Sequence, residues 1–174
     1  MKSVQLVTIA GLAISLAACD EDPFESQRPD MPPPPAQGVQ AFLQVDNDNA
    51  TPGQRIRVYV SVQFGVDEDA KLGSYTGALR FNVEALEWKR DIAINDGLRV
   101  TNPESAPGEV RFAGASARGF EENVLYRGEF TVKDANYLEQ LRFELEELTA
   151  AESLTDLKPE LEMTPKIFLR TGQN

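Results

Sequence analysis

The stretch from Gln54 to Phe64 constrains the fold of this chain more than any other. Every second position in it is apolar: Ile56, Val58, Val60, Val62 and Phe64. A repeat of two is typical of a β-strand with one buried face, whereas a helix would need apolar residues three and four positions apart. The segment therefore predicts a strand that packs one face against a core.

The same alternation recurs at short intervals along the chain. Further strands are predicted at 41–45, 72–82, 86–88, 98–101, 110–114, 126–132, 141–145 and 167–169. Polar turns separate them, among them the proline-rich turn at Asn102–Gly108. The segment Thr149–Asp156 predicts one helical turn, because Thr149 and Glu152 have capping-box spacing. About nine short strands with almost no helix predict an all-β fold, a nine-stranded jelly-roll β-sandwich.

Residues 1–18 have the form of a secretory signal peptide, with Lys2 before an apolar run. The run ends in Leu16-Ala17-Ala18-Cys19, which contains the single cysteine of the sequence. This ending resembles the lipobox of bacterial lipoproteins. The resemblance implies lipidation of Cys19 and export to the cell-envelope membrane, on its periplasmic or cell-surface side. The alternatives are a signal peptide without lipid, or an uncleaved anchor, although a spanning helix needs about 20 apolar residues.

Residues 19–39 predict a flexible, proline-rich tether. The run Pro32–Pro35 lies within it, and proline can join neither a helix interior nor a central strand. Such a segment is expected to be partly extended polyproline II, which at about 3.1 Å per residue gives a reach of roughly 50–60 Å. A fully disordered coil is the alternative. The folded domain is then expected at residues 40–171.

Composition excludes several classes of function. The chain has 28 acidic and 17 basic residues, a formal net charge of −11, and no histidine. Nucleic-acid binding requires a basic surface, and histidine-dependent catalysis is impossible. Asp46–Asn49 lacks the glycine and the distal glutamate of an EF-hand calcium loop. Asp67-Glu68-Asp69 could hold calcium, but an acidic, solvated loop is the commoner structure, so neither a metal nor a cofactor is predicted.

Carboxylate chemistry is the remaining common catalytic option. Glu144, Glu146 and Glu147 are the candidates, but on a strand Glu144 and Glu146 are neighbours on the solvent face. Nothing places a proton-donating acid opposite a base, as hydrolysis would require. The sequence therefore predicts a protein that is not an enzyme.

Four segments together resemble cohesin domains. They are Pro52-Gly53 before the alternating strand, Leu72-Gly73-Ser74-Tyr75 leading through Leu79-Arg80-Phe81-Asn82 to Ala85-Leu86-Glu87, Gly108–Ala113, and Val124–Val132. The similarity runs over roughly Ala41 to Arg170. It implies a nine-stranded jelly roll related to cellulose-binding modules, with dockerin-like proteins as partners and polysaccharide as the ligand of some relatives.

The resemblance also implies a partner-binding sheet face, built largely from the third, fifth, sixth and eighth strands. The predicted partner-binding residues are Ser74, Thr76, Arg80, Arg111, Leu125 and Arg127. Arg99 is predicted to point outward with them. The three arginines Arg80, Arg111 and Arg127 could form a basic stripe that selects an acidic partner. Alternatively, each arginine pairs with neighbouring Glu109 or Glu129, at little energetic gain.

A flat sugar-binding face would need a row of exposed aromatic rings. By alternation Trp88, Tyr75 and Tyr126 point inward, and Tyr59 points outward. The sequence thus predicts a membrane-anchored, non-catalytic module that recognises an exported, dockerin-like protein. The alternatives are a carbohydrate-binding module involved in polysaccharide binding or catabolism, and a structural envelope lipoprotein.

Overall fold

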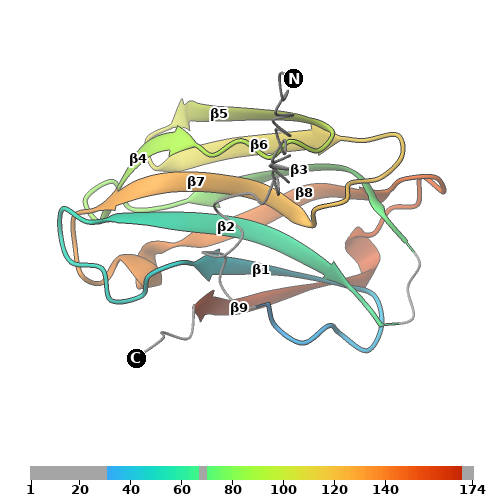
Figure 1. Cartoon of the computed structure of the whole chain (residues 1–174), viewed down its shortest axis with the longest axis horizontal. Coiled ribbons are helices and arrows are strands. Elements are labelled where there is room, and N and C mark those ends of the chain that lie inside the picture. The colour runs from blue at the N-terminus through green and yellow to red at the C-terminus, as the bar shows by residue number, and fades with distance from the viewer. Residues whose placement is uncertain (1–30, 67–69, 170–174) are drawn as a thin grey trace, which may run out of the picture.

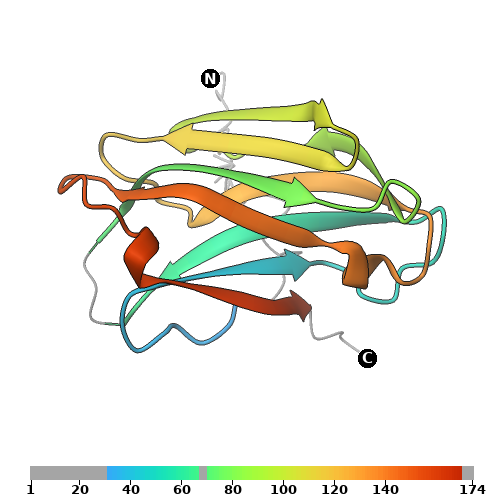
Figure 2. The same ribbon diagram turned by 180° about the vertical axis from the view of Figure 1, so that it is seen from behind.

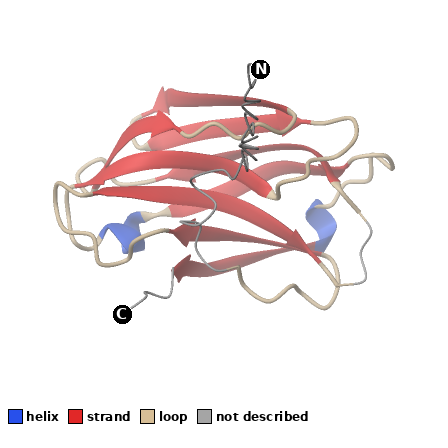
Figure 3. Ribbon diagram, viewed as in Figure 1, coloured by secondary structure: helices blue, strands red, loops and turns tan. Residues whose placement is uncertain are grey.

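The computed structural model describes residues 31–66 and 70–169. This part of the chain forms nine strands and two short 3-10 helices (Figures 1 and 3). The strands are β1 (Val39–Val45), β2 (Arg55–Phe64), β3 (Leu72–Arg80), β4 (Leu86–Asp91), β5 (Leu98–Ala106), β6 (Glu109–Ala115), β7 (Val124–Val132), β8 (Arg142–Ala150) and β9 (Leu161–Leu169). The 3-10 helices are η2 (Tyr137–Gln140) and η3 (Lys158–Glu160). The predicted all-β fold is confirmed.

The strands form two sheets packed face to face. One has five strands in the order β4-β7-β2-β1-β9, and the other has four in the order β5-β6-β3-β8. Neighbours are antiparallel, except that β1 and β9 run parallel. Figure 1 looks onto the five-stranded sheet, and Figure 2 looks onto the four-stranded sheet from behind.

The core lies between the sheets and is built from alternate residues, as the sequence predicts. Val58 and Val60 of β2 are fully buried in it. The ring of Phe112 stacks on that of Tyr126, with centroids 5.4 Å apart. Trp88 packs against the core, and its Nε1–H donates to the Tyr126 hydroxyl at 3.1 Å. The predicted inward direction of Trp88, Tyr75 and Tyr126 is confirmed.

Two local predictions are wrong. β5 continues to Ala106, so the predicted proline-rich turn shrinks to the end of a hairpin at Gly108, where φ is +74°. The predicted helical turn at Thr149–Asp156 is absent: Thr149 lies in β8 and pairs with Ser74 of β3. Pairing with a neighbouring strand satisfies this backbone, and one isolated helical turn could not compete with it.

The N-terminal predictions fall mostly outside the described residues. The signal peptide at 1–18 and the lipidation site Cys19 both lie before residue 31. Of the predicted tether, residues 31–38 lead into β1, which begins at Val39. Within residues 31–66 and 70–169, no helix is both long enough and apolar enough to span a bilayer.

Candidate functional site

The outer face of the four-stranded sheet brings together four of the six predicted partner-binding residues. Thr76 lies opposite Ala113, and Arg80 lies opposite Glu109 in the β3–β6 ladder. Ser74 lies opposite Ala115 in the same ladder, so it shares the side of Thr76 and Arg80. Arg111 lies two residues after Glu109 on β6 and joins them. We call this surface the front face.

One half of the front face is apolar. Leu98 and Val100, at the start of β5, are 69% and 59% exposed. They pair with Ala115 and Ala113 of β6, whose small side chains leave the two larger ones standing above the sheet. A shallow depression of about 360 Å³ adjoins this half, lined by Thr76, Val100, Asn102, Arg111, Ala113 and Glu146, among others. Apolar side chains this exposed and this close together are typical of a binding surface.

The sequence-based prediction assigned β5 the opposite orientation. It placed Arg99 outward, which would turn Leu98 and Val100 toward the core. In the structure Arg99 points inward and its side chain is only 12% exposed. An alternating pattern with one arginine between two apolar residues favours burial of the apolar pair, but in β5 the contacts of Arg99 with Tyr75 and Val124 hold the arginine inward instead.

The other half of the front face is charged but neutralised. Arg80 Nε lies 2.8 Å from Glu109 Oε2, and Arg80 Nη1 lies 2.9 Å from Glu144 Oε2. Arg111 pairs with Glu146 and lies 3.9 Å from Glu109. The basic stripe is therefore wrong, and the alternative of neighbouring ion pairs is confirmed for both arginines. The hydrogen bond from Arg80 holds the pKa of Glu109 below its usual range.

This ion pair carries a prediction about pH. Because the pKa of Glu109 is lowered in the folded state, its carboxylate adds stability above its unfolded pKa, and this is lost as pH falls through the folded value. In Arg80→Ala we expect the pKa of Glu109 to rise toward that of a free glutamate, as measured by carbon-detected NMR titration. Glu87, whose pKa is lowered by Lys89, is the internal control and should not move. An unchanged Glu109 titration would contradict the assignment.

Two predicted partner-binding residues do not lie on the front face. Leu125 and Arg127 belong to β7, which lies between β4 and β2 in the five-stranded sheet. Leu125 is buried in the core, and Arg127 is 6% exposed and donates to the carbonyl of Ala93 at 2.7 Å. Glu129 on the same strand pairs with Arg55 and Arg90 instead. Alternation does not show which sheet β7 joins, and it fails at Leu125, which lies in the core beside Tyr126 where the β2–β7 register shifts.

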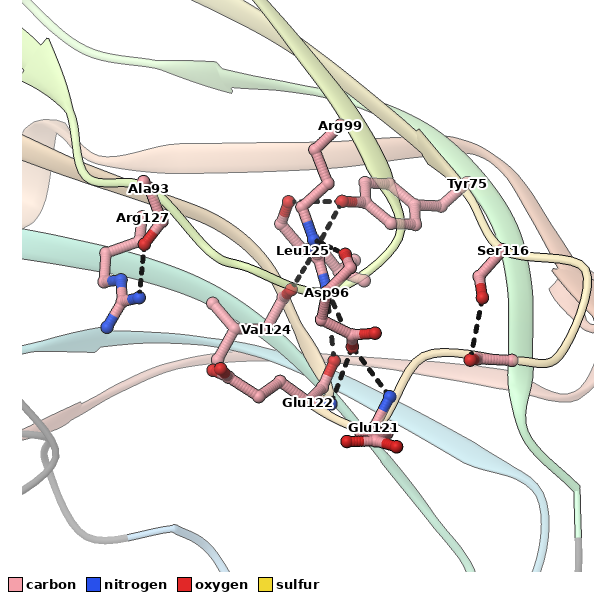
Figure 4. A network of polar contacts seen from close by, with 11 residues as sticks. Tyr75, Ala93, Asp96, Arg99, Ser116, Glu121, Glu122, Val124, Leu125 and Arg127 are labelled. Atoms are coloured by element: carbon pink, nitrogen blue, oxygen red, sulfur yellow. Dashed lines mark hydrogen bonds and ion pairs between the residues drawn. The ribbon is translucent and has the colours of Figure 1, made fainter. Parts of the chain in front are cut away.

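The front face rests on a buried polar cluster behind β5 (Figure 4), which we call the Arg99 clamp. The Arg99 guanidinium donates to the Tyr75 hydroxyl at 2.7 Å and to the Val124 carbonyl at 2.5 Å. It also lies over the Phe120 ring, 4.3 Å from the centroid. Asp96 pairs with Arg99 at 3.5 Å and accepts the backbone N–H groups of residues 121 and 122.

The clamp joins the two sheets. Arg99 comes from β5 and Tyr75 from β3, both in the four-stranded sheet, whereas Val124 begins β7 in the other sheet. The Tyr75 hydroxyl itself donates to the Leu125 carbonyl at 2.8 Å. Gly114 of β6 leaves room for the Tyr75 ring, because a Cβ there would lie 2.5 Å from the ring carbon Cζ. The clamp thus fixes the edge strand that presents Leu98 and Val100.

A sugar platform finds no support in the described residues. None of their large exposed apolar side chains is aromatic. Tyr59, predicted to point outward, does lie on the outer side of its sheet, but it is 0% exposed. The prediction of its exposure is wrong because alternation reports the side of a sheet and not what covers that side.

The acidic segments have structural partners. Asp46 Oδ1 accepts the N–H of Arg57 at 2.8 Å, and Asn47 Oδ1 accepts the N–H of Asn49 at 3.0 Å, so both shape the β1–β2 turn. Asp67–Asp69 lies outside the described residues. Elsewhere in the described chain, no three carboxylates or other ligands gather as a metal site would require.

The comparisons with known proteins concern the fold. The sequence matches no protein-family model and no curated protein. Twenty-seven solved chains match the structure. A cohesin module from a Clostridium perfringens family 33 glycoside hydrolase has a TM-score of 0.55 at 19% identity, covering 77% of this chain and 98% of that one.

Two further cohesins of known structure also match, one from an archaeon and one from a bacterial scaffoldin. A non-cellulosomal cohesin from Archaeoglobus fulgidus has a TM-score of 0.51 at 17% identity, covering 76% of this chain and 86% of its own. The sixth cohesin of scaffoldin B from Acetivibrio cellulolyticus, solved in complex with a Cel5 dockerin, has a TM-score of 0.51 at 15% identity and covers 76% and 99%. The described part of this chain therefore has a cohesin-like β-sandwich fold.

Proposed function

We propose that this chain is a membrane-anchored, non-catalytic recognition module that binds an exported, dockerin-like protein through its front face. The exposed pair Leu98 and Val100 is the observation that carries the proposal. Burying two such side chains against a partner would release water from apolar surface, which is the main driving force of protein association. The solved complexes of similar cohesins with dockerins support the same class of partner.

In this proposal, the charged half of the front face determines how the partner is positioned on it. Arg80 and Arg111 already have carboxylate partners, so an acidic partner would have to displace Glu109, Glu144 or Glu146. Exposed ion pairs add little affinity but penalise a partner with the wrong charge pattern. The partner is therefore expected to contact the apolar half and to place polar groups over the ion pairs.

Anchoring is the second part of the proposal and rests on the sequence. Lipidated Cys19 would hold the domain at the cell-envelope membrane, and the proline-rich segment after it would act as the spacer. The module would then present its front face to other exported proteins.

Two binding experiments, one with proteins and one with polysaccharide, test the proposal. The domain, immobilised through its C-terminus, is incubated with the exported proteins of its native cell, and in parallel run on a gel that carries polysaccharide. We expect retention of a protein in the first experiment and no retardation in the second. Retardation by polysaccharide alone would favour a carbohydrate-binding module, and binding to neither would favour a structural envelope lipoprotein.

A further inference from the structure

A pocket opens at one edge of the β-sandwich, between the two sheets. β4 is the edge strand of the five-stranded sheet, and β5 is the edge strand of the four-stranded sheet. The chain passes directly from one to the other, so the two edges lie together (Figure 1). A cavity of about 350 Å³ lies there, lined mainly by β5, β7 and the end of β4 with the loop after it. We call this cavity the side pocket, and its size is typical of a site for a small ligand.

Asp91, the last residue of β4, lies on the inner side of its sheet and lines the side pocket. It pairs with Gly128 of β7, and a Cβ added at Gly128 would overlap the hydroxyl of Tyr126, which belongs to the core. The preceding residue, Arg90, pairs with Glu129 in the same ladder and lies on the opposite, outer side. The carboxylate of Asp91 therefore enters the space between the sheets at their edge.

This carboxylate has lost part of its water. Desolvation by the pocket walls raises the pKa of Asp91, and hydrogen bonds from Thr101, Trp88 and Tyr126 offset the rise only in part. Asp91 nevertheless remains open to solvent, so a ligand can reach it. A partly desolvated carboxylate is stabilised by a cation placed beside it, because the cation replaces the missing hydration.

The neighbouring arginines do not supply that cation. Arg99 belongs to the Arg99 clamp, where it pairs with Asp96 at 3.5 Å. Arg127 lies on the outer side of its sheet, since neighbouring Tyr126 faces the core, and it donates to a carbonyl of the β4–β5 loop at 2.7 Å. In the described part of the chain, Asp91 forms no ion pair. The side pocket thus contains one negative charge without a counter-charge.

The lining of the side pocket favours one class of ligand. An alkylammonium ion has a positive charge, three N–H donors and no acceptor. Asp91 supplies the opposite charge and an acceptor, and the hydroxyl of Thr101 supplies another acceptor. Ile92, Ile94 and Leu125 line the same pocket and suit an aliphatic chain. An anion would be repelled by Asp91, and a neutral ligand would leave its charge uncompensated.

We propose that the side pocket binds an alkylammonium group, carried by a small amine or by a lysine side chain, with Asp91 as its counter-ion. The pocket adjoins the front face at Leu98 and Val100, which line both. Its polar groups lie between the sheets, however, whereas the front face is the outer surface of the four-stranded sheet. The site requires neither the lipid anchor nor the dockerin-like partner.

Binding of small probes to the full-length protein at neutral pH tests the proposal. n-Butylamine and acetyl-lysine amide with a free side-chain amine carry the ammonium group, and n-butanol has the carbon chain of n-butylamine without the charge. Calorimetry and the fluorescence of Trp88, the single tryptophan, measure binding. We expect both amines to bind saturably and n-butanol to bind at least about tenfold more weakly, because hydrogen bonds between charged groups are the strong ones. If only one of the two amines binds, the result identifies the source of the ammonium group.

The variant Asp91→Asn keeps the shape of the side chain without its charge, and should bind the amines at least about tenfold more weakly. Glu139→Gln, which removes an exposed carboxylate from η2, is the matched control and should bind like the unchanged protein. A second measurement needs no variant. Saturation with n-butylamine should lower the pKa of Asp91 in carbon-detected NMR, because a cation favours the carboxylate form, and the pKa of Glu109 should not move.

Four results would each overturn the inference. They are the absence of saturable binding of either amine, equal binding of n-butanol and n-butylamine, unchanged affinity in Asp91→Asn, and a pKa of Asp91 that n-butylamine does not move. Equal binding of n-butanol would mean that the cavity binds aliphatic chains without using the carboxylate. None of these measurements involves the partner of the front face, so failure of the side pocket leaves the proposed function standing.

Discussion

Replacing Arg99 by alanine is expected to destabilise the domain by about 3 kcal/mol, the cost typical of breaking a buried charged network. The substitution removes the donors to the Tyr75 hydroxyl and the Val124 carbonyl and leaves Asp96 without its guanidinium partner. It also removes the cation above the Phe120 ring. Urea unfolding followed by the fluorescence of Trp88, the single tryptophan, measures the loss.

Arg118→Ala is the matched control. Arg118 is exposed in the loop before Gly119, and no hydrogen bond or ion pair of its side chain occurs among the described residues. Arg99→Lys should recover only part of the stability, because an ammonium cannot reproduce the several directed contacts of a guanidinium. If Arg99→Ala unfolds at the same urea concentration as Arg118→Ala, the Arg99 clamp does not hold the sheets together.

The double substitution of Leu98 and Val100 by aspartate is expected to weaken partner binding at least about 30-fold, or about 2 kcal/mol, as loss of a binding hot spot does. Both side chains are already exposed, so the change removes apolar contact surface without opening the core. Each new carboxylate would also lose water on docking without gaining a counter-charge. Calorimetric titration with the captured partner measures the effect.

Leu154→Asp controls for the general effect of adding charge. Leu154 is 78% exposed, lies after β8 and away from the front face, and has a positive φ that aspartate tolerates well. All variants should keep the unfolding midpoint of the unchanged protein. Equal affinity in the double variant and in Leu154→Asp would mean that the partner docks elsewhere.

The candidate site could be predicted only in part. Ser74, Thr76, Arg80 and Arg111 were found because β3 and β6 alternate regularly, so their outward residues follow from the period of two. Leu98 and Val100 were missed because their exposure depends on the Arg99 clamp, which holds the arginine of this edge strand inward. Arg127 was misplaced because β7 alternates in the same way in either sheet, and Leu125 because a register shift between β2 and β7 turns it into the core.

The sequence by itself determined the class of fold and, for regularly alternating strands such as β2 and β3, the side that faces the core. Those properties follow from the spacing of apolar residues, which is local and survives any arrangement of the strands. Only the tertiary structure decided which strands are neighbours and which outward side chains are exposed. Tyr59 illustrates the difference: its side of β2 can be read from five alternating residues, but its complete burial cannot.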